Sequence, residues 1–286
     1  MPEAIAVARW AFFAAATVAF GTALFAFYAA TGKRTELTAA NQRIVAASAT
    51  VALIAGAGWL ALTIVSFGAT DFGSFLNIGR TILFETKFGP VWGLRLTAAL
   101  MLVPIAFAPV PMAILLLSTI VLGSEAWIGH AATNGPLHQA SQLVHLLAAG
   151  AWLGGLVPLE RVLRAGLHDG NNAARASAVV QRFSAMGIVA VLAILASGIA
   201  NSVFEVGFRL DLAKDYDRLL LAKLILFLAM VGVALFNRLR LMPALADPSG
   251  NRVALRRFLF TVAIEQALGL AALLAASLLG MSDPHA

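Results

Sequence analysis

Cysteine is absent from this chain of 286 residues. Its absence excludes thiolate metal sites, disulfides and thiol redox chemistry together. A metal ion bound by this protein would therefore have to be held by imidazole, carboxylate, thioether or backbone oxygen.

Charged residues are also scarce. They make up only 12% of the chain, whereas 60% of the residues are hydrophobic and the mean hydropathy is +0.88. This composition excludes a soluble domain, because so much apolar surface has to be buried in lipid. We therefore predict an all-α polytopic membrane protein, with residues 1–286 forming a single integral domain surrounded by membrane lipid. The net charge of +6 does not indicate a nucleic-acid partner, because the basic residues lie in loops between apolar runs.

Catalytic motifs are missing as well. The sequence has no P-loop, no H-E-x-x-H motif and no nucleophile with a base nearby. We therefore predict that the protein is not an enzyme. Any transport would be passive or coupled to an ion gradient, because nothing indicates pumping driven by ATP.

Eight apolar runs predict about eight transmembrane helices of roughly 20 residues each. The third and fourth runs are separated only by residues 108–111, which predicts a tight helical hairpin. Residues 68–90 are amphipathic, and we expect a short helix there on the membrane surface. The predicted spans are about 9–30, 44–67, 91–108, 111–128, 138–159, 183–204, 219–236 and 258–281.

Lysine and arginine are distributed unevenly between alternate loops. By the positive-inside rule the richer side is cytoplasmic, which predicts a multi-pass protein of the inner (cytoplasmic) membrane with both termini outward, in the periplasm. The richer side carries twelve basic residues: Lys33, Arg34, Arg43, Arg161, Arg164, Arg175, Arg182, Arg238, Arg240, Arg252, Arg256 and Arg257. The other side carries seven: Arg9, Arg80, Lys87, Arg95, Arg209, Lys214 and Arg218.

A weak internal repeat links the third and seventh predicted helices. Trp92 and Arg95 follow Phe88 at the start of the third, and Lys223 follows Tyr216 at the start of the seventh. This pattern is compatible with two parallel repeats of four helices. Ordinary interfacial anchoring would give the same pattern, and then Arg95 and Lys223 would snorkel to the outer headgroups.

Three of the five histidines lie within sixteen residues, at His130, His138 and His145. Ionisable groups at membrane depth are costly, so such a cluster predicts a functional site. His138 and His145 are seven residues apart, which places them two turns apart on one helix face and favours two successive stations over one shared ion. His130 could fold back to share the outer station with His138. The plainer alternative is that the three are amphipathic residues of the membrane interface.

Two carboxylates are candidate partners of these histidines. Glu125 lies near the outer end of the fourth predicted helix, and we expect it to join His145. Glu265 lies deep in the eighth, where an unpaired carboxylate would be very expensive. It is expected to pair with Lys223 or a polar group, or to be protonated, and a structural bond is as plausible as a role in an ion path. For Asn201 and Asn237 we expect capping or interhelical bonding.

The histidine segment contains a motif that comprises G-H-A at 129–131, His138, His145, Trp152, Gly154, Gly155, Leu156 and Pro158. This motif resembles the signature of the CopD family of bacterial copper-resistance inner-membrane proteins. The resemblance extends to the two aromatic-to-basic helix starts, to Asn237-Arg238 and to Glu265, and so covers most of the chain. Asp217 departs from it, because a glycine is expected there.

The resemblance implies copper transport or homeostasis, with His130, His138 and His145 handling the copper ion. It also implies a periplasmic copper-binding partner of the CopC type, for which residues 68–90 are a candidate contact. Two alternatives remain open at this stage. The protein could deliver copper at its outer face without transporting it, or it could be a b-type haem electron carrier, which would need a second axial ligand beside His145.

Overall fold

The computed structural model describes residues 2–29, 37–132, 134–168, 170–206, 211–245 and 251–282. These residues form helices and no strands. The helices are α1 Pro2–Tyr28, α2 Ala39–Ser66, α3 Phe72–Glu85, α4 Gly89–Ile105, α5 Pro111–Gly123, α6 Pro136–Ala149, α7 Gly155–His168, α8 Gly170–Val206, α9 Asp215–Phe236, α10 Met242–Ala244 and α11 Asn251–Leu279. Short 3₁₀ segments cover Ser124–Trp127 and His130–Ala132.

A helix lies at each of the eight positions predicted from the sequence. Among the described residues, six helices are long and apolar enough to cross a membrane, or seven if α3 and α4 count as one span. The segment Pro111–Trp127 is a shorter apolar helix. The count of eight spans therefore stays a prediction.

The segment predicted to form a surface helix does contain a helix, α3, which turns by 98° into α4; its place on the membrane surface stays a prediction. A capping box defines its start: the Ser74 amide donates to Asp71 and the Ser74 hydroxyl contacts the Asp71 backbone. Phe72 and Phe84 are largely exposed, at 77% and 80%, whereas Phe75, Ile78, Ile82 and Leu83 pack against the core, so α3 is held to the bundle with part of its apolar surface exposed. This is the arrangement expected of a helix that lies in a membrane interface.

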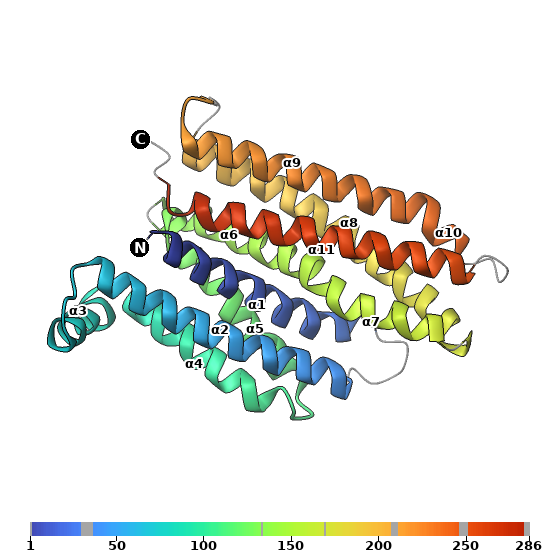
Figure 1. The fold of residues 1–286 in the computed structure, drawn as a ribbon, viewed down its shortest axis with the longest axis horizontal. Helices are drawn as coiled ribbons and strands as arrows, with labels where there is room; N and C mark the ends of the chain where they lie inside the picture. Colours follow the sequence, from blue (N-terminus) through green and yellow to red (C-terminus); the bar gives the residue numbers. More distant parts are fainter. Residues whose placement is uncertain are drawn as a thin grey trace.

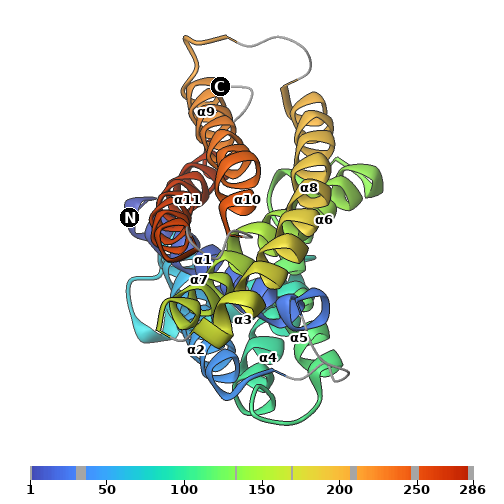
Figure 2. The same cartoon turned by 90° about the vertical axis from the view of Figure 1, so that its right-hand side faces the viewer.

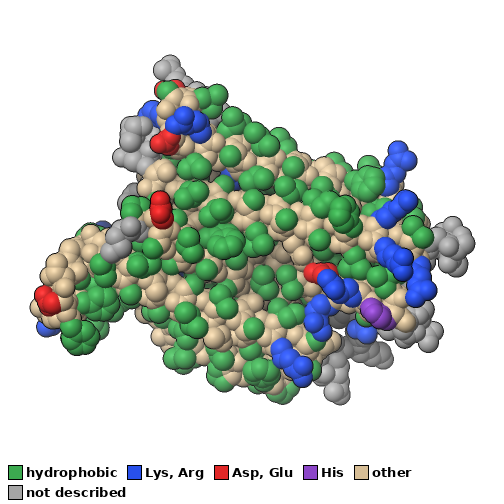
Figure 3. Space-filling view, in the orientation of Figure 1, with side chains coloured by type: hydrophobic (Ala, Val, Ile, Leu, Met, Phe, Trp, Pro, Cys, Tyr) green, Lys and Arg blue, Asp and Glu red, His purple; other side chains and the backbone are tan. Residues whose placement is uncertain are grey.

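Helix α1 is central to the bundle: it packs against α2 and α5 on one side and against α7 and α11 on the other. Figure 1 shows α2 and α4 in the lower part of the molecule, α9 and α11 in the upper part, and both termini at one end. Lysine and arginine gather at the opposite end, around the end of α7 and α10 (Figure 3).

Helices α6 and α7 form one long element interrupted by a π-helical segment, Gly150–Gly154. Pro158 follows Gly154 by four residues and has no N–H to give to its carbonyl, which accounts for the irregular turn. A Cβ atom at Gly154 would collide with the Thr17 carbonyl oxygen of α1. Gly154 therefore allows the π-helical segment to pack closely against α1.

The two halves of the chain differ in one helix contact. In the first half α2 packs along α4, whereas α8 and α9 do not pack along each other over their described residues. Figure 2 shows α8 and α9 standing apart at one side of the bundle. A cavity of about 210 Å³ lies between them, with α7 and α11 forming its other walls. The proposed four-helix repeat stays a prediction.

Candidate functional site

His138 lies in the first turn of α6 and is completely buried. Its ring stacks on Phe204 of α8, with 5.0 Å between the ring centroids. Its Nε2 atom lies 3.5 Å from Oε1 of Glu205, the next residue of α8. The predicted outer histidine is therefore held between an aromatic ring and a carboxylate.

Glu205 connects three helices at this end of the bundle. Besides facing His138 of α6, it accepts a hydrogen bond from the Tyr216 hydroxyl at the start of α9. Lys223, two turns along α9, lies within electrostatic reach of both Glu205 and His145. Lys223 therefore faces the histidine cluster and does not approach Glu265.

His145 lies two turns further along α6. Its Nδ1 atom is 3.1 Å from the Ser197 hydroxyl of α8, and Gly198 lies against its ring. A hydrogen bond at one ring nitrogen fixes the orientation of an imidazole and leaves the other nitrogen as the possible metal ligand. In this arrangement that atom is Nε2.

Further polar bonds join α6 and α8 around the two histidines. The Asn201 amide donates to the Gln142 side chain at 2.7 Å, and the Ser141 hydroxyl donates to the Ser197 carbonyl at 3.2 Å. The interhelical role expected of Asn201 is confirmed. These bonds fix the rotation of α6 against α8 and so determine which way the imidazoles face.

Glu125 has a different partner from the one we predicted. It forms a buried ion pair with Arg95 of α4, with 2.5 Å between Oε1 and Nη2. The hairpin of α4 and α5 brings these two side chains together, and a buried carboxylate needs a cation more than it needs a neutral imidazole.

The snorkelling alternative for Arg95 is wrong, because this side chain is completely buried. Its guanidinium donates to Ser124 at 2.9 Å. It also lies 4.7 Å from the ring centre of Phe12, 4.8 Å from that of Trp92 and 5.2 Å from that of Trp59. Arg95 and Glu125 form a structural unit of the first half.

Glu265 is buried in α11 and accepts a hydrogen bond from the Asn237 amide at 2.6 Å. Of the partners considered for it, the polar group is therefore the observed one. Both residues, together with Trp152, line the cavity between α8 and α9. Trp152 and Asn237 each belong to a π-helical segment, a local irregularity often found at functional sites.

His130 begins the short 3₁₀ segment before α6, and its side chain lies outside the described part of the structure. Among the described residues, no three His, Asp or Glu side chains are close enough together to hold one metal ion. The predicted ligands are thus spread over separate positions: the His138 pair, the His145 pair, the Arg95–Glu125 pair and the Glu265 cavity.

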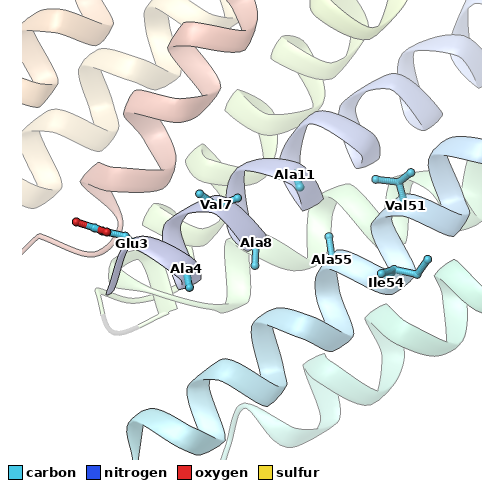
Figure 4. Close-up of a pocket in the computed structure, with 8 residues that line it drawn as sticks. All are labelled: Glu3, Ala4, Val7, Ala8, Ala11, Val51, Ile54 and Ala55. Atoms are coloured by element: carbon cyan, nitrogen blue, oxygen red, sulfur yellow. The ribbon is translucent and has the colours of Figure 1, made fainter. Parts of the chain in front are cut away.

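A second pocket lies at the surface of the molecule between α1 and α2 (Figure 4). It has a volume of about 550 Å³ and apolar walls, with Glu3 at its edge as the single charged residue. It offers no set of metal ligands, so the candidate site remains the one between α6, α8 and α9. The lining residues are Glu3, Ala4, Val7, Ala8, Ala11, Val51, Ile54 and Ala55.

Comparison with known proteins identifies the family to which the chain belongs. Residues 177–279 match the family copper resistance protein D, and residues 1–140 match the copper resistance protein D-like N-terminal domain. The inner membrane protein YebZ of Escherichia coli K12 is 31% identical, over 96% of this chain and 97% of that protein. The chain belongs to the copper resistance protein D family.

Copper resistance protein D of Pseudomonas syringae pv. tomato is also 31% identical, over 85% of this chain and 83% of that protein. No solved structure matches the chain. Membership of the copper resistance protein D family, together with the apolar helices, gives a copper-related function and a multi-pass inner-membrane location.

Two residues of this candidate site, Glu205 and Ser197, were not anticipated from the sequence. Glu205 was missed because it lies at the polar end of α8, 67 positions from His138, and nothing in the local pattern links the two. Ser197 was missed because serines are common in transmembrane helices. The available signal was the spacing of Ser197, Asn201 and Glu205, which recur every four residues and so share one helix face.

Proposed function

We propose that this protein transports copper across the inner membrane. Copper enters from the outer face at His138, passes to His145 and continues along the polar side chains between α6, α8 and α9. The carrying observation is that the buried imidazole of His138 and the half-buried imidazole of His145 lie on one face of α6, each held by a polar group of α8. Imidazole suits copper, and copper(II) binds nitrogen and oxygen sites more strongly than the other divalent metals of its series.

In this proposal the protein crosses the membrane eight times with both termini in the periplasm, which places His138 at the outer end of its helix. Below His145 the route reaches the cavity that contains Glu265 and Trp152. Glu125 takes no part in it, because Arg95 occupies its carboxylate. The protein performs no catalysis, and its flux follows a concentration or ion gradient.

A copper-loading and uptake experiment tests the proposal. Parent protein, His138→Ala, His145→Ala and the control His168→Ala are purified in detergent and also reconstituted in vesicles. The control fits because His168 is exposed at the basic end and bonded to the Arg164 carbonyl. We expect both site variants to reduce copper uptake at least about tenfold, in line with the loss of a metal-orienting contact, while the control matches the parent.

Three results would change the proposal. Uptake equal to the parent in both site variants would contradict it. Copper binding without uptake by the parent would indicate a delivery factor at the outer face. A Soret absorption band in the purified protein would indicate a haem carrier.

We further propose that a periplasmic CopC-like copper-binding protein docks on α3. Support comes from its exposed Phe72 and Phe84 and from its position at the end of the bundle that carries the termini. Phe84→Glu is expected to slow copper handover from such a partner without changing copper binding by the isolated protein. Unchanged handover in that variant would refute the docking site.

A further inference from the structure

We propose that Glu205 is a copper ligand and completes the outer station with His138. This inference rests on the proposed function. The sequence places the histidines of the site on a single helix, α6, and the inference adds a ligand from a second helix, α8. It converts the capture site from a single imidazole into a nitrogen and oxygen pair that joins α6 to α8.

The distance between the two side chains fits a bridging ion. Nε2 of His138 and Oε1 of Glu205 are 3.5 Å apart, longer than a hydrogen bond between charged groups. Imidazole nitrogen and carboxylate oxygen each bind a small divalent metal at about 2.0–2.2 Å. An ion between these two atoms would therefore make both bonds at an open angle without displacement of either helix.

The surroundings hold both ligands in place. Stacking on Phe204 fixes the plane of the imidazole, and the Tyr216 hydroxyl binds the other oxygen of Glu205. Such supporting contacts orient metal ligands and raise their affinity. The two ligands also differ in exposure: His138 is completely buried, whereas Glu205 is 17% exposed. An ion from outside would thus meet the carboxylate first.

The charges explain why a carboxylate is needed here. Lys223 lies within electrostatic reach of Glu205 and would repel an incoming cation. The negative charge of Glu205 offsets that repulsion, whereas a neutral imidazole alone would not. When copper is bound, the carboxylate of Glu205 would interact electrostatically with both the metal ion and Lys223.

The test compares copper(II) binding by the detergent-purified full chain in six forms: parent, Glu205→Gln, Glu205→His, Tyr216→Phe, His138→Ala and Glu160→Gln. Glu160 is the matched control, because it is also a hydrogen-bonded helix carboxylate but lies on α7 beside Arg164. Affinity is measured by chelator competition and coordination by electron paramagnetic resonance. Size-exclusion chromatography and melting without copper check the fold of each form.

We expect Glu205→Gln to raise the dissociation constant at least about tenfold, and Glu160→Gln to leave it unchanged. Glu205→His returns a metal-binding nitrogen, so it should keep most of the affinity and add a nitrogen coupling to the spectrum. A purely structural carboxylate would not give that rescue. Tyr216→Phe leaves the ligand in place but loosens it, and should weaken binding less than Glu205→Gln.

The failures are distinguishable. If His138→Ala abolishes binding while Glu205→Gln binds like the parent, the ligand role of Glu205 is refuted and the proposed function stands. Equal losses in Glu205→His and Glu205→Gln would also refute it. If the parent binds no copper, the capture step of the proposed function fails. If Glu205→Gln aggregates, Glu205→His and Tyr216→Phe decide the question.

Discussion

At the scale of single residues, the Arg95–Glu125 pair is the most demanding feature of the interior. Both side chains are almost completely removed from solvent. Charges in such surroundings are tolerated only when they are paired and further stabilised by hydrogen bonds or polarisable groups. Ser124 and the three aromatic rings around the guanidinium supply those contacts.

Breaking this pair should therefore destabilise the protein strongly. Glu125→Gln leaves a buried guanidinium without its counter-charge, and we expect a loss of about 3–5 kcal/mol in the free energy of unfolding. The measurement is equilibrium unfolding in mixed detergent and sodium dodecyl sulfate. The double variant Arg95→Leu, Glu125→Leu removes both charges and should cost less than the sum of the single changes. Additive losses would show that the two residues do not interact.

At the scale of elements, α3 depends on its capping box. The Ser74 amide donates to the Asp71 carboxylate and lowers the pKa of that carboxyl below its ordinary value of 3.8. The pKa of Asp71 is lower in the folded protein than in the unfolded chain. The ionised cap therefore stabilises α3 fully when the pH is above the ordinary pKa of 3.8. The contribution is lost as the pH falls through the lowered pKa.

Amide hydrogen exchange at the start of α3 measures this contribution. We expect Asp71→Ala to reduce the protection of residues 73–76, whereas Asp71→Asn keeps an oxygen acceptor and most of the protection. The acid-dependent loss should disappear in Asp71→Asn, which has no proton to bind at that position. Equal protection in the parent and Asp71→Ala would show that the cap does not hold the helix.

The contact between α1 and the π-helical segment should tolerate no side chain. Gly154→Ala would push a Cβ atom into the Thr17 carbonyl oxygen. This oxygen belongs to the backbone of α1, which cannot rotate away as a flexible side chain could. We expect a cost of at least about 1–3 kcal/mol, the range typical of overpacking, seen as a lower yield of folded protein. Gly232→Ala is the control, because nothing lies within 4 Å of its added Cβ atom. A normal yield of Gly154→Ala would contradict the close approach.

At the scale of the whole molecule, the distribution of charge sets the orientation in the membrane. Lysine and arginine gather at one end and both termini lie at the other (Figures 1 and 3). A C-terminal alkaline phosphatase fusion should therefore be active, and a C-terminal green fluorescent protein fusion should be dark. The opposite pattern would place the basic end outside. A fusion in the loop between α10 and α11 serves as the inverse control.

The sequence was sufficient to place the helices, because apolar runs of membrane length are unambiguous. It was less accurate at their ends. Helix α8 begins at Gly170, well before the predicted residue 183, and α7 continues to His168, beyond the predicted residue 159. A hydropathy pattern detects only the part of a helix that lies in lipid. The polar turns that extend into water carry no such signal.

The candidate site was predicted in part. His138 and His145 stood out because ionisable residues are rare in this chain, but their partners Glu205 and Ser197 did not. Contact between helices depends on how each is rotated, and the sequence alone does not fix that rotation. The same limit explains why Glu125 was assigned to His145 when its partner is Arg95.

The cavity that contains Glu265 reaches the outer surface between two helices that do not pack along each other, and exposed apolar side chains such as Ile188, Leu192 and Leu235 line it. In a bilayer, acyl chains would complete its wall. One wall of the cavity beside this buried carboxyl would therefore be lipid, so detergent micelles and bilayers of different chain length would fill the cavity differently. The polarity around Glu265 should therefore depend on the lipid or detergent as well as on the protein.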